Sequence, residues 1–213
     1  MRALALSLAL LATPALAQTA TEDAPEAAPP TVTKAEATTL QGNDHLIGSV
    51  DAPHEMVVYA SVTCGHCGDW FSKEWPVVKS ELVDTGVLRV AFRPFPPAPS
   101  QLSIPGFMLA GCGPEDGYWD HVVHQMQSQQ TTFAAAQAGE AREVIMDFGR
   151  RAGLDTEAEV EACFADDDVF AEIDLNMRRA EAAGLSGVPA FFFDGQEVGR
   201  AHDAEDIVAL AAE

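Results

Sequence analysis

A pair of cysteines at the junction of a predicted strand and a predicted helix constrains the fold of this chain more than any other feature. Cys64 and Cys67 stand in the segment Thr-Cys-Gly-His-Cys-Gly. The apolar, β-branched run from Met56 to Val62 precedes them directly, and its length and composition are typical of a central strand that is buried on both faces. The cysteine pair therefore follows a buried strand.

The residues that follow the pair predict a helix. Large apolar side chains recur there at near-helical intervals, at Trp70, Phe71, Trp75, Val78 and Leu82. We expect the helix to run from about Cys64 to Asp84, with a kink at Pro76 and a stop at Gly86. Cys64 then lies at the helix N-terminus, and Cys67 lies about one turn further along.

This position predicts an unusually acidic first cysteine. Free backbone N–H groups and the positive end of the helix dipole converge at a helix N-terminus, and both favour a thiolate over a thiol. A protonated His66 beside Cys64 favours the thiolate further. Such surroundings lower the pKa of a cysteine from about 8.5 to between roughly 3.5 and 7.5. Because a thiolate is both the attacking species and a good leaving group, the pattern predicts a redox-active dithiol.

The alternative interpretation of Cys64 and Cys67 is one half of a zinc site. A structural zinc ion generally takes four ligands, from two such pairs or from one pair and two histidines. The sequence has no second Cys-x-x-Cys, and nothing in it fixes His121 and His124 near the pair. We therefore favour redox chemistry and predict neither a metal nor a small cofactor at this site.

The remainder of the chain completes an α/β pattern. A second strand, Val87 to Arg93, is followed by several prolines, and a helical pattern then runs from about residue 100 to 184. Within this block Thr156 and Glu159 have the spacing of a capping box. The helical pattern also holds an apolar stripe, at Val169, Phe170, Ile173 and Met177.

Four short elements close the chain. They are a strand at 190–193, a turn at Asp194-Gly195, a strand at 197–199 and a helix at 204–212. The order is therefore a βαβ half, a helical insertion and a ββα half, which together form one sheet with helices on its faces.

The N-terminal residues predict export. Residues 1–17 have the features of a signal peptide: an early arginine, an apolar run at 3–11, and Ala15-Leu16-Ala17 as a cleavage site. The apolar run is shorter than the roughly 20 residues of a membrane span, which argues against an anchor. Residues 18–41 are rich in Ala, Thr, Pro and Glu, and we expect a disordered linker there before a domain at 42–213. The predicted location is the periplasm.

The net charge of the chain limits the classes of molecule that it can bind. It has 33 acidic residues against 12 lysines and arginines, a formal net charge of −21. A chain of this charge repels nucleic acid and anionic lipid, so we exclude nucleic acid as a partner.

A second motif, Gly187-Val188-Pro189, stands directly before the strand at 190–193. An X–Pro bond is cis in only about 5–6% of cases in folded proteins, so this segment alone is an ordinary strand entry. Combined with the cysteine pair upstream, it resembles thioredoxin-like proteins, in which a cis-proline begins the third strand and faces the active disulfide.

The chain resembles the DsbA-like thioredoxin family of bacterial exported oxidoreductases, including its BdbD-type branch. The resemblance covers about residues 42–213. It rests on four elements: the segment His45 to Pro53, the strand into Cys-Gly-His-Cys, the helical insertion, and the segment Gly187 to Phe192. It implies a thioredoxin-like fold with the insertion, at about 100–184, between the βαβ and ββα halves.

The resemblance also implies roles for single residues. Cys64 is the nucleophile that forms a mixed disulfide, Cys67 is the buried resolving cysteine, and His66 stabilises the Cys64 thiolate. Pro189, in cis, keeps metal ions off the dithiol and shapes a peptide groove. Val188 offers backbone hydrogen bonds to an extended substrate.

Two departures from the family pattern bear on mechanism. Many relatives carry a buried acid six positions before the first cysteine, where this chain has Val58. Proton transfer from Cys67 must then use water or another group, and Glu74 is one candidate. The dipeptide Gly65-His66 is that of eukaryotic disulfide isomerases, whereas enteric DsbA has Pro-His, which leaves the oxidant strength open.

The two other cysteines, Cys112 and Cys163, both lie in the insertion. We favour a structural disulfide between them over a second redox pair, and a plain buried thiol at Cys163 is a further alternative. His121 and His124 stand three apart on a predicted helix. A copper site is conceivable there, but a solvated helix face is the simpler interpretation.

These features lead to three functional hypotheses. The first is an enzyme whose Cys64–Cys67 disulfide accepts electrons from reduced exported proteins and is reoxidised by a quinone-linked membrane partner, the latter implied by the resemblance alone. The second is a periplasmic reductase or isomerase with the same site. The third is a copper or zinc carrier that binds its metal through both cysteines.

Overall fold

The computed structural model of the chain describes residues 31–96, 102–198 and 203–213. The predicted signal peptide at 1–17 and the linker at 18–30 lie outside these ranges, as does the end of the predicted strand at 197–199. Within the described residues no helix has the length and apolar character needed to span a membrane.

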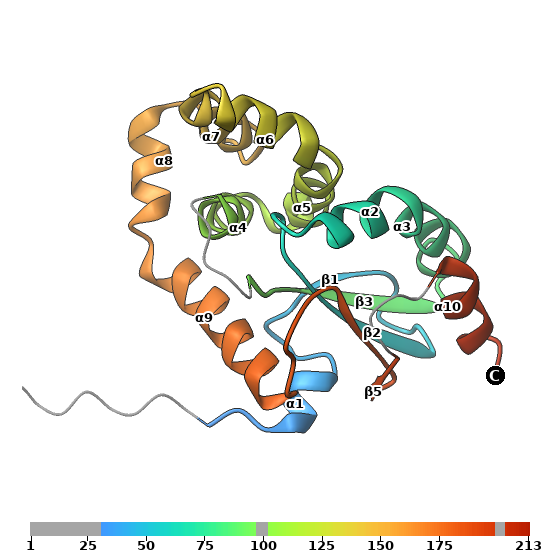
Figure 1. Ribbon diagram of the computed structural model, residues 1–213. Coiled ribbons are helices and arrows are strands. Elements are labelled where there is room, and N and C mark those ends of the chain that lie inside the picture. Colours follow the sequence, from blue (N-terminus) through green and yellow to red (C-terminus); the bar gives the residue numbers. More distant parts are fainter. Residues whose placement is uncertain (1–30, 97–101, 199–202) are drawn as a thin grey trace, which may run out of the picture. The chain divides into compact units, whose positions relative to one another are not determined.

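A mixed five-stranded sheet forms the centre of the folded domain (Figure 1). Its strands are β1 (His45–Ile47), β2 (His54–Ala60), β3 (Leu88–Pro94), β4 (Ala190–Phe193) and β5 (Gln196–Glu197). Their order is β1-β3-β2-β4-β5, with β2 parallel to β3 and every other pair antiparallel. The apolar run before the cysteines is therefore the central strand, as predicted, and its residues 56–60 are fully buried.

The helix after the cysteines is present but divided. It consists of α2 (Gly65–Lys73), α3 (Trp75–Val78) and the π-helical turn η1 (Lys79–Val83). The break falls where predicted, since Pro76 has no N–H to continue the hydrogen-bond ladder of α2. Gly86 adopts a φ of +78°, a left-handed conformation that suits the end of a helix. The C-terminal helix α10 (Ala204–Leu210) packs beside α3.

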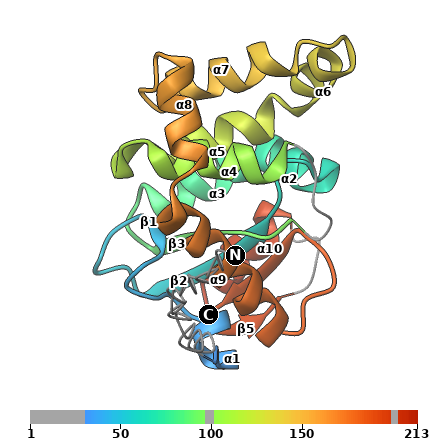
Figure 2. The same cartoon turned by 90° about the vertical axis from the view of Figure 1, so that its left-hand side faces the viewer.

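The predicted insertion is entirely helical in its described residues. Its elements are α4 (Ser103–Cys112), η2 (Glu115–Gly117), α5 (Tyr118–Gln127), α6 (Gln129–Gln137), α7 (Ala141–Arg151), α8 (Glu157–Phe164) and α9 (Asp167–Ala182). Figure 2 shows α4 and α5 between the sheet and the α6–α7 pair. Helix α5 packs on α2, and α9 returns the chain to the sheet beside β3. The capping box of Thr156 and Glu159 begins α8 as predicted. The predicted thioredoxin-like order of a βαβ half, a helical insertion and a ββα half is thus confirmed.

Stacked aromatic rings join the insertion to the cysteine-bearing half. Trp75 of α3 and Trp119 of α5 stack with ring centroids 4.9 Å apart. Phe92 of β3 contacts the rings of both Phe71 and Trp119. Burial of such rings is a large favourable term, so α5 is held firmly against α2 and α3.

The predicted apolar stripe on α9 is wrong at Phe170, which is 46% exposed. The face of α9 that packs inward carries Ile173, Asn176 and Ala180 instead. At about 100° per residue these three residues lie within about 60° of one another on the helix, whereas Phe170 lies about 60–120° from each of them.

The folded domain begins before residue 42, where the sequence predicted its start. The helix α1 (Lys34–Thr38) lies within the predicted linker and starts at a capping box between Thr33 and Glu36. The guanidinium of Arg93, fully buried in β3, donates to the carbonyl oxygens of Glu36, Ala37 and Thr39 at 2.7–3.0 Å. The prediction of a disordered linker is therefore wrong for residues 34–41, because their main chain satisfies a buried arginine.

A buried carboxylate completes this arrangement. Asp44 accepts hydrogen bonds from Nε and Nη2 of Arg93 at 2.9 and 2.7 Å, and it lies 3.0 Å from Nη1 of Arg179 in α9. Neither the Asp44 nor the Arg93 side chain is exposed. One carboxylate thus joins the N-terminal segment, the sheet and the last helix of the insertion.

We predict that Asp44→Asn destabilises the protein strongly. The variant leaves two buried guanidinium groups without their counter-ion, and breaking a buried pair in this way costs about 3–5 kcal/mol. Urea unfolding at neutral pH measures the change. The matched control is Glu157→Gln, which removes a carboxylate from the exposed pair with Arg142 and should change little. Similar small effects from both variants would contradict this role of Asp44.

Candidate active site

A tight turn after β2 delivers Cys64 to the N-terminus of α2. Cys64 is the N-cap residue of the helix, and its N–H donates to the carbonyl oxygen of Ser61 at 3.0 Å. The hydroxyl of Ser61 also accepts a hydrogen bond from the N–H of Thr63 at 3.3 Å. Both cysteines of the pair are free thiols; Cys64 is half-buried, and Cys67 in the first turn of α2 is fully buried.

The pKa of Cys64 is lowered to about 6. The largest cause is a hydrogen bond from the Cys67 side chain to the Cys64 sulfur, and partial burial opposes it. The backbone N–H groups of Cys67 and His66 and the charge of His66 lower the pKa further. These are the helix N-terminal effects that the sequence predicted, with the second thiol as an additional donor.

The pKa of Cys67 is shifted in the opposite direction. Burial raises it well above the ordinary value for a thiol, and the neighbouring Cys64 raises it further. Cys67 therefore stays protonated at neutral pH and donates, while Cys64 is largely a thiolate. The two sulfurs differ in both acidity and exposure, so only Cys64 is suited to attack a partner.

The second predicted motif lies against this pair. The Val188–Pro189 peptide bond is cis, and Pro189 is buried directly before β4. The carbonyl oxygen of Val188 lies 3.5 Å from Sγ of Cys64. The structure thus brings Cys64, Cys67, Val188 and Pro189 together from segments that are far apart in the sequence, with the exposed His66 next to Cys64.

No acid lies behind Cys67 at the position where many relatives have one. Val58 is fully buried in β2 and pairs with Phe92 on one side and Phe191 on the other. The proposed substitute, Glu74, uses its carboxylate to accept the N–H of Ala204 at 2.9 Å and so caps α10. This contact gives Glu74 a structural role at the start of α10.

One residue at the site is not apparent from the sequence. Gln129, the first residue of α6, is buried and donates from Nε2 to the carbonyl oxygen of Cys64 at 3.0 Å. The two residues are separated by 65 positions, and no local pattern around Gln129 indicates the contact.

The remaining cysteines form a disulfide within the insertion. Cys112 at the end of α4 and Cys163 in α8 are bonded, with their Cα atoms 5.9 Å apart. The pairing joins two helices of the insertion and leaves Cys64 and Cys67 as the free cysteines.

His121 and His124, for which the sequence favoured a solvated helix face over a copper site, lie on α5 in different surroundings. His121 is buried next to the ring of Phe148, and burial lowers its pKa to about 4. The interpretation as a solvated helix face is therefore wrong for His121. Burial also lowers the pKa of the more exposed His124. Among the described residues no cluster of three or more His, Cys, Asp or Glu side chains could hold a metal ion.

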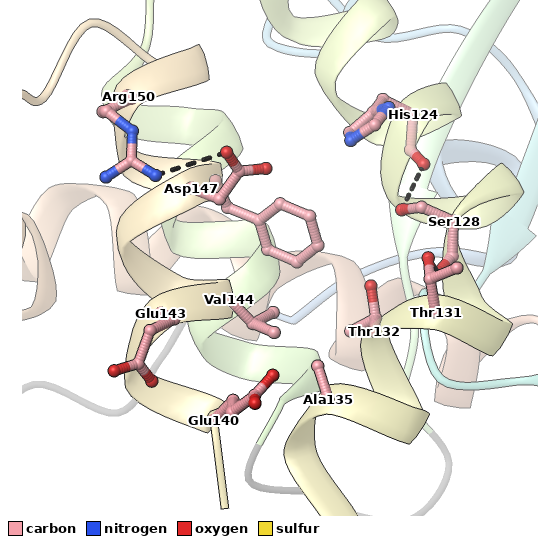
Figure 3. Close-up of a pocket in the computed structure, with 11 residues that line it drawn as sticks. His124, Ser128, Thr131, Thr132, Ala135, Glu140, Glu143, Val144, Asp147 and Arg150 are labelled. Carbon is pink, nitrogen blue, oxygen red and sulfur yellow. Dashed lines mark hydrogen bonds and ion pairs between the residues drawn. The ribbon is translucent and has the colours of Figure 1, made fainter. Parts of the chain in front are cut away.

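A cavity of about 450 Å³ lies elsewhere in the insertion, between α5, α6 and α7 (Figure 3). His124 and Ser128 line one side of it, and Glu143 and Asp147 of α7 line the other. Asp147 is paired with Arg150 at 3.3 Å. The lining contains neither a residue of the Cys64 turn nor Pro189, so this cavity is separate from the dithiol.

A dithiol at a helix N-terminus, beside a cis-proline that opens the neighbouring strand, defines the thioredoxin class of proteins. The chain belongs to the thioredoxin family, since the family model described as Thioredoxin matches residues 40–211.

Individual relatives carry more specific names. A curated relative from Rickettsia conorii, named "Putative protein-disulfide oxidoreductase", is 26% identical over 161 residues, which are 75% of this chain and 56% of the relative. The chain thus spans little more than half the length of that relative.

Two solved structures illustrate the similarity in fold. The crystal structure of alpha-DsbA1 from Wolbachia pipientis superposes with a TM-score of 0.74 at 21% identity, covering 84% of this chain and 94% of that one. Oxidised BdbD from Bacillus subtilis gives a TM-score of 0.63 at 13% identity, covering 79% and 91%. Both comparisons show a shared fold.

Alkylation of the reduced protein tests the acidity of Cys64. We expect the rate of iodoacetamide reaction at Cys64 to rise with pH about a midpoint near 6, while Cys67 remains unreacted. In Cys67→Ala the thiol donor is lost, so the midpoint should move up towards the value of about 8.5 of a free cysteine. Mass spectrometry of the modified peptides gives both results.

The lowered pKa of Cys64 also determines how the stability of the reduced protein changes with pH. Because the pKa of Cys64 is lower in the folded than in the unfolded chain, its contribution to the stability of the reduced protein is complete above about pH 8.5 and is lost as the pH falls through about 6. A wild-type alkylation midpoint near that of a free thiol would contradict both statements.

Proposed function

We propose that this protein is an exported thiol–disulfide oxidoreductase of the DsbA-like kind, which introduces disulfides into secreted proteins through Cys64 and Cys67. The observation that carries the proposal is the geometry of the site: half-buried Cys64 caps the N-terminus of α2, buried Cys67 lies in its first turn, and the cis Val188–Pro189 segment lies against the Cys64 sulfur. The opposite shifts of the two pKa values, downward to about 6 at Cys64 and upward at Cys67, support it. The name of the Rickettsia relative, a protein-disulfide oxidoreductase, supports the same reaction class.

The reaction consists of two thiol–disulfide exchanges. A substrate thiolate attacks Sγ of Cys64 in the oxidised protein, which forms a mixed disulfide and breaks the Cys64–Cys67 bond; Cys67 leaves and takes up a proton. A second substrate thiolate then attacks the substrate sulfur of the mixed disulfide and releases Cys64 as a thiolate. Two electrons pass to the protein, and the substrate gains a disulfide.

The surrounding residues support these steps. His66 stabilises the Cys64 thiolate by its charge. Val188, whose carbonyl lies against the Cys64 sulfur, offers main-chain hydrogen bonds to an extended substrate. In this proposal Pro189, which stands in cis directly before β4, shapes a peptide groove and keeps metal ions away from the dithiol.

The stabilised thiolate supports the proposed direction of electron flow. An environment that favours the reduced form makes the disulfide an oxidant. The proposed substrates are reduced, unfolded proteins in the periplasm. The protein itself is exported there by a signal peptide at residues 1–17, and a linker that ends before α1 follows this peptide. We also propose that a quinone-linked membrane partner reoxidises the dithiol and that the chain belongs to the BdbD-type branch.

One observation favours a second candidate, a periplasmic reductase or isomerase. The dipeptide between the cysteines is Gly65-His66, as in eukaryotic disulfide isomerases. The hypothesis of a copper or zinc carrier gains no such support, since Cys64 and Cys67 belong to no larger ligand cluster among the described residues.

The redox potential of the Cys64–Cys67 pair distinguishes the candidates. Equilibration with glutathione buffers should give a value nearer to the roughly −120 mV of DsbA than to the roughly −270 mV of thioredoxin. The oxidised protein should also form disulfides in a reduced, unfolded test protein, and Cys64→Ala should abolish this activity.

The control is the double variant Cys112→Ala/Cys163→Ala, which removes the disulfide of the insertion. It should keep the potential and the oxidase activity, although its stability should fall. A potential near that of thioredoxin would overturn the oxidase proposal in favour of the reductase.

A further inference from the structure

A buried amide of the insertion reaches the main chain of the active-site turn. Gln129 is only 7% exposed, and its Nε2 donates to the carbonyl oxygen of Cys64 at 3.0 Å. The same carbonyl accepts the N–H of Gly68, the first backbone bond of α2, also at 3.0 Å. The peptide group that carries the attacking cysteine is therefore held by two donors, one from its own helix and one from α6.

The surroundings of Gln129 fix the direction of its amide. A Cβ atom built on Gly68 would lie 2.5 Å from Oε1 of Gln129, so the side chain packs directly against the glycine. On its other side Nε2 lies 3.8 Å from the sulfur of Met126. Because the amide is enclosed by α2 and α5, its nitrogen is held toward the Cys64 carbonyl.

We infer that Gln129 is a positioning residue that maintains the acidity of Cys64. The inference rests on the proposed function, in which Cys64 is the attacking sulfur. The N–H groups of His66 and Cys67 stabilise its thiolate from the first turn of α2. The bond from Gln129 fixes the Cys64 end of that turn, so that the sulfur stays within reach of these donors. The positive end of the amide dipole also lies beside Cys64.

A second glutamine, which is more exposed than Gln129, provides a control. Gln127, at the end of α5, donates from Nε2 to the carbonyl oxygen of Phe71 at 3.3 Å. It thus makes the same type of bond to the same helix, but near its C-terminal end and away from the cysteines. Loss of this bond should weaken the packing of the insertion on α2 without a change in the Cys64 thiolate.

The primary test uses Gln129→Met in the full-length, reduced protein. Methionine keeps the length of the side chain and removes its donor. Ultraviolet absorbance of the thiolate, followed against pH, should show the pKa of Cys64 raised by about 0.5–1 unit, because the turn that holds the sulfur near the N–H groups of His66 and Cys67 loses one support. The redox potential should become more negative, and Gln127→Met should leave the pKa unchanged.

Gly68→Ala tests the same contact from the other side. The new methyl group displaces Gln129, so this variant should raise the Cys64 pKa as Gln129→Met does, even though alanine favours a helix more than glycine. In the double variant Gly68→Ala/Gln129→Ala the pKa should equal that of Gln129→Ala alone, because the displaced group is already absent.

The outcomes separate this inference from the proposed function. If wild-type Cys64 titrates like a free thiol, the proposed function fails. If wild-type Cys64 is acidic but Gln129→Met leaves its pKa unchanged, or if the effects of Gly68→Ala and Gln129→Ala add in the double variant, the inference alone is overturned. Should Gln129→Met fold poorly, Gln129→Ala replaces it; this variant also removes the donor and must raise the pKa of Cys64.

Discussion

The chemistry of this protein depends on the unequal sharing of a proton between two sulfurs in one helical turn. The Cys67 thiol and the first backbone N–H groups of α2 point at the sulfur of Cys64, so the negative charge of a thiolate is stabilised there and excluded from Cys67. Because Cys67 is fully buried, only Cys64 can meet a partner. Attack and release at one defined sulfur follow from this asymmetry.

The rest of the fold holds that turn in place. The buried strand β2 delivers Cys64 to the start of α2, and β4 brings the Val188–Pro189 segment against its sulfur. Helix α5 packs on α2 and stacks the ring of Trp119 on that of Trp75 in α3, and Gln129 extends the contact to the Cys64 main chain. The buried ion pairs of Asp44 join the N-terminal segment, β3 and α9. The insertion therefore packs over α2 and α3 and also supports the turn that carries Cys64.

Local signals were sufficient for much of this architecture. The apolar run of β2, the proline at the start of α3 and the Thr156 capping box each act within a few residues. The hairpin after β4 is likewise local, since Asp194 and Gly195 both adopt positive φ, the conformation of an Asp-Gly turn. The short elements α1 and β1 were not predicted. The capping box of Thr33 and Glu36 is a local signal for α1, but both elements are only a few residues long and are held by contacts with β3. The bond from Gln129 to Cys64 also escaped prediction, since it joins residues 65 positions apart.

The relative stability of the oxidised and reduced proteins tests the central claim most directly. An ordinary disulfide stabilises a folded protein, whereas a strongly stabilised thiolate reverses the order. Urea unfolding at pH 7 of a Cys112→Ala/Cys163→Ala background isolates the active pair. The account predicts that the reduced form unfolds at the higher urea concentration. An oxidised form more stable than the reduced one would show that stabilisation of the thiolate does not outweigh that of the disulfide, and would contradict the account.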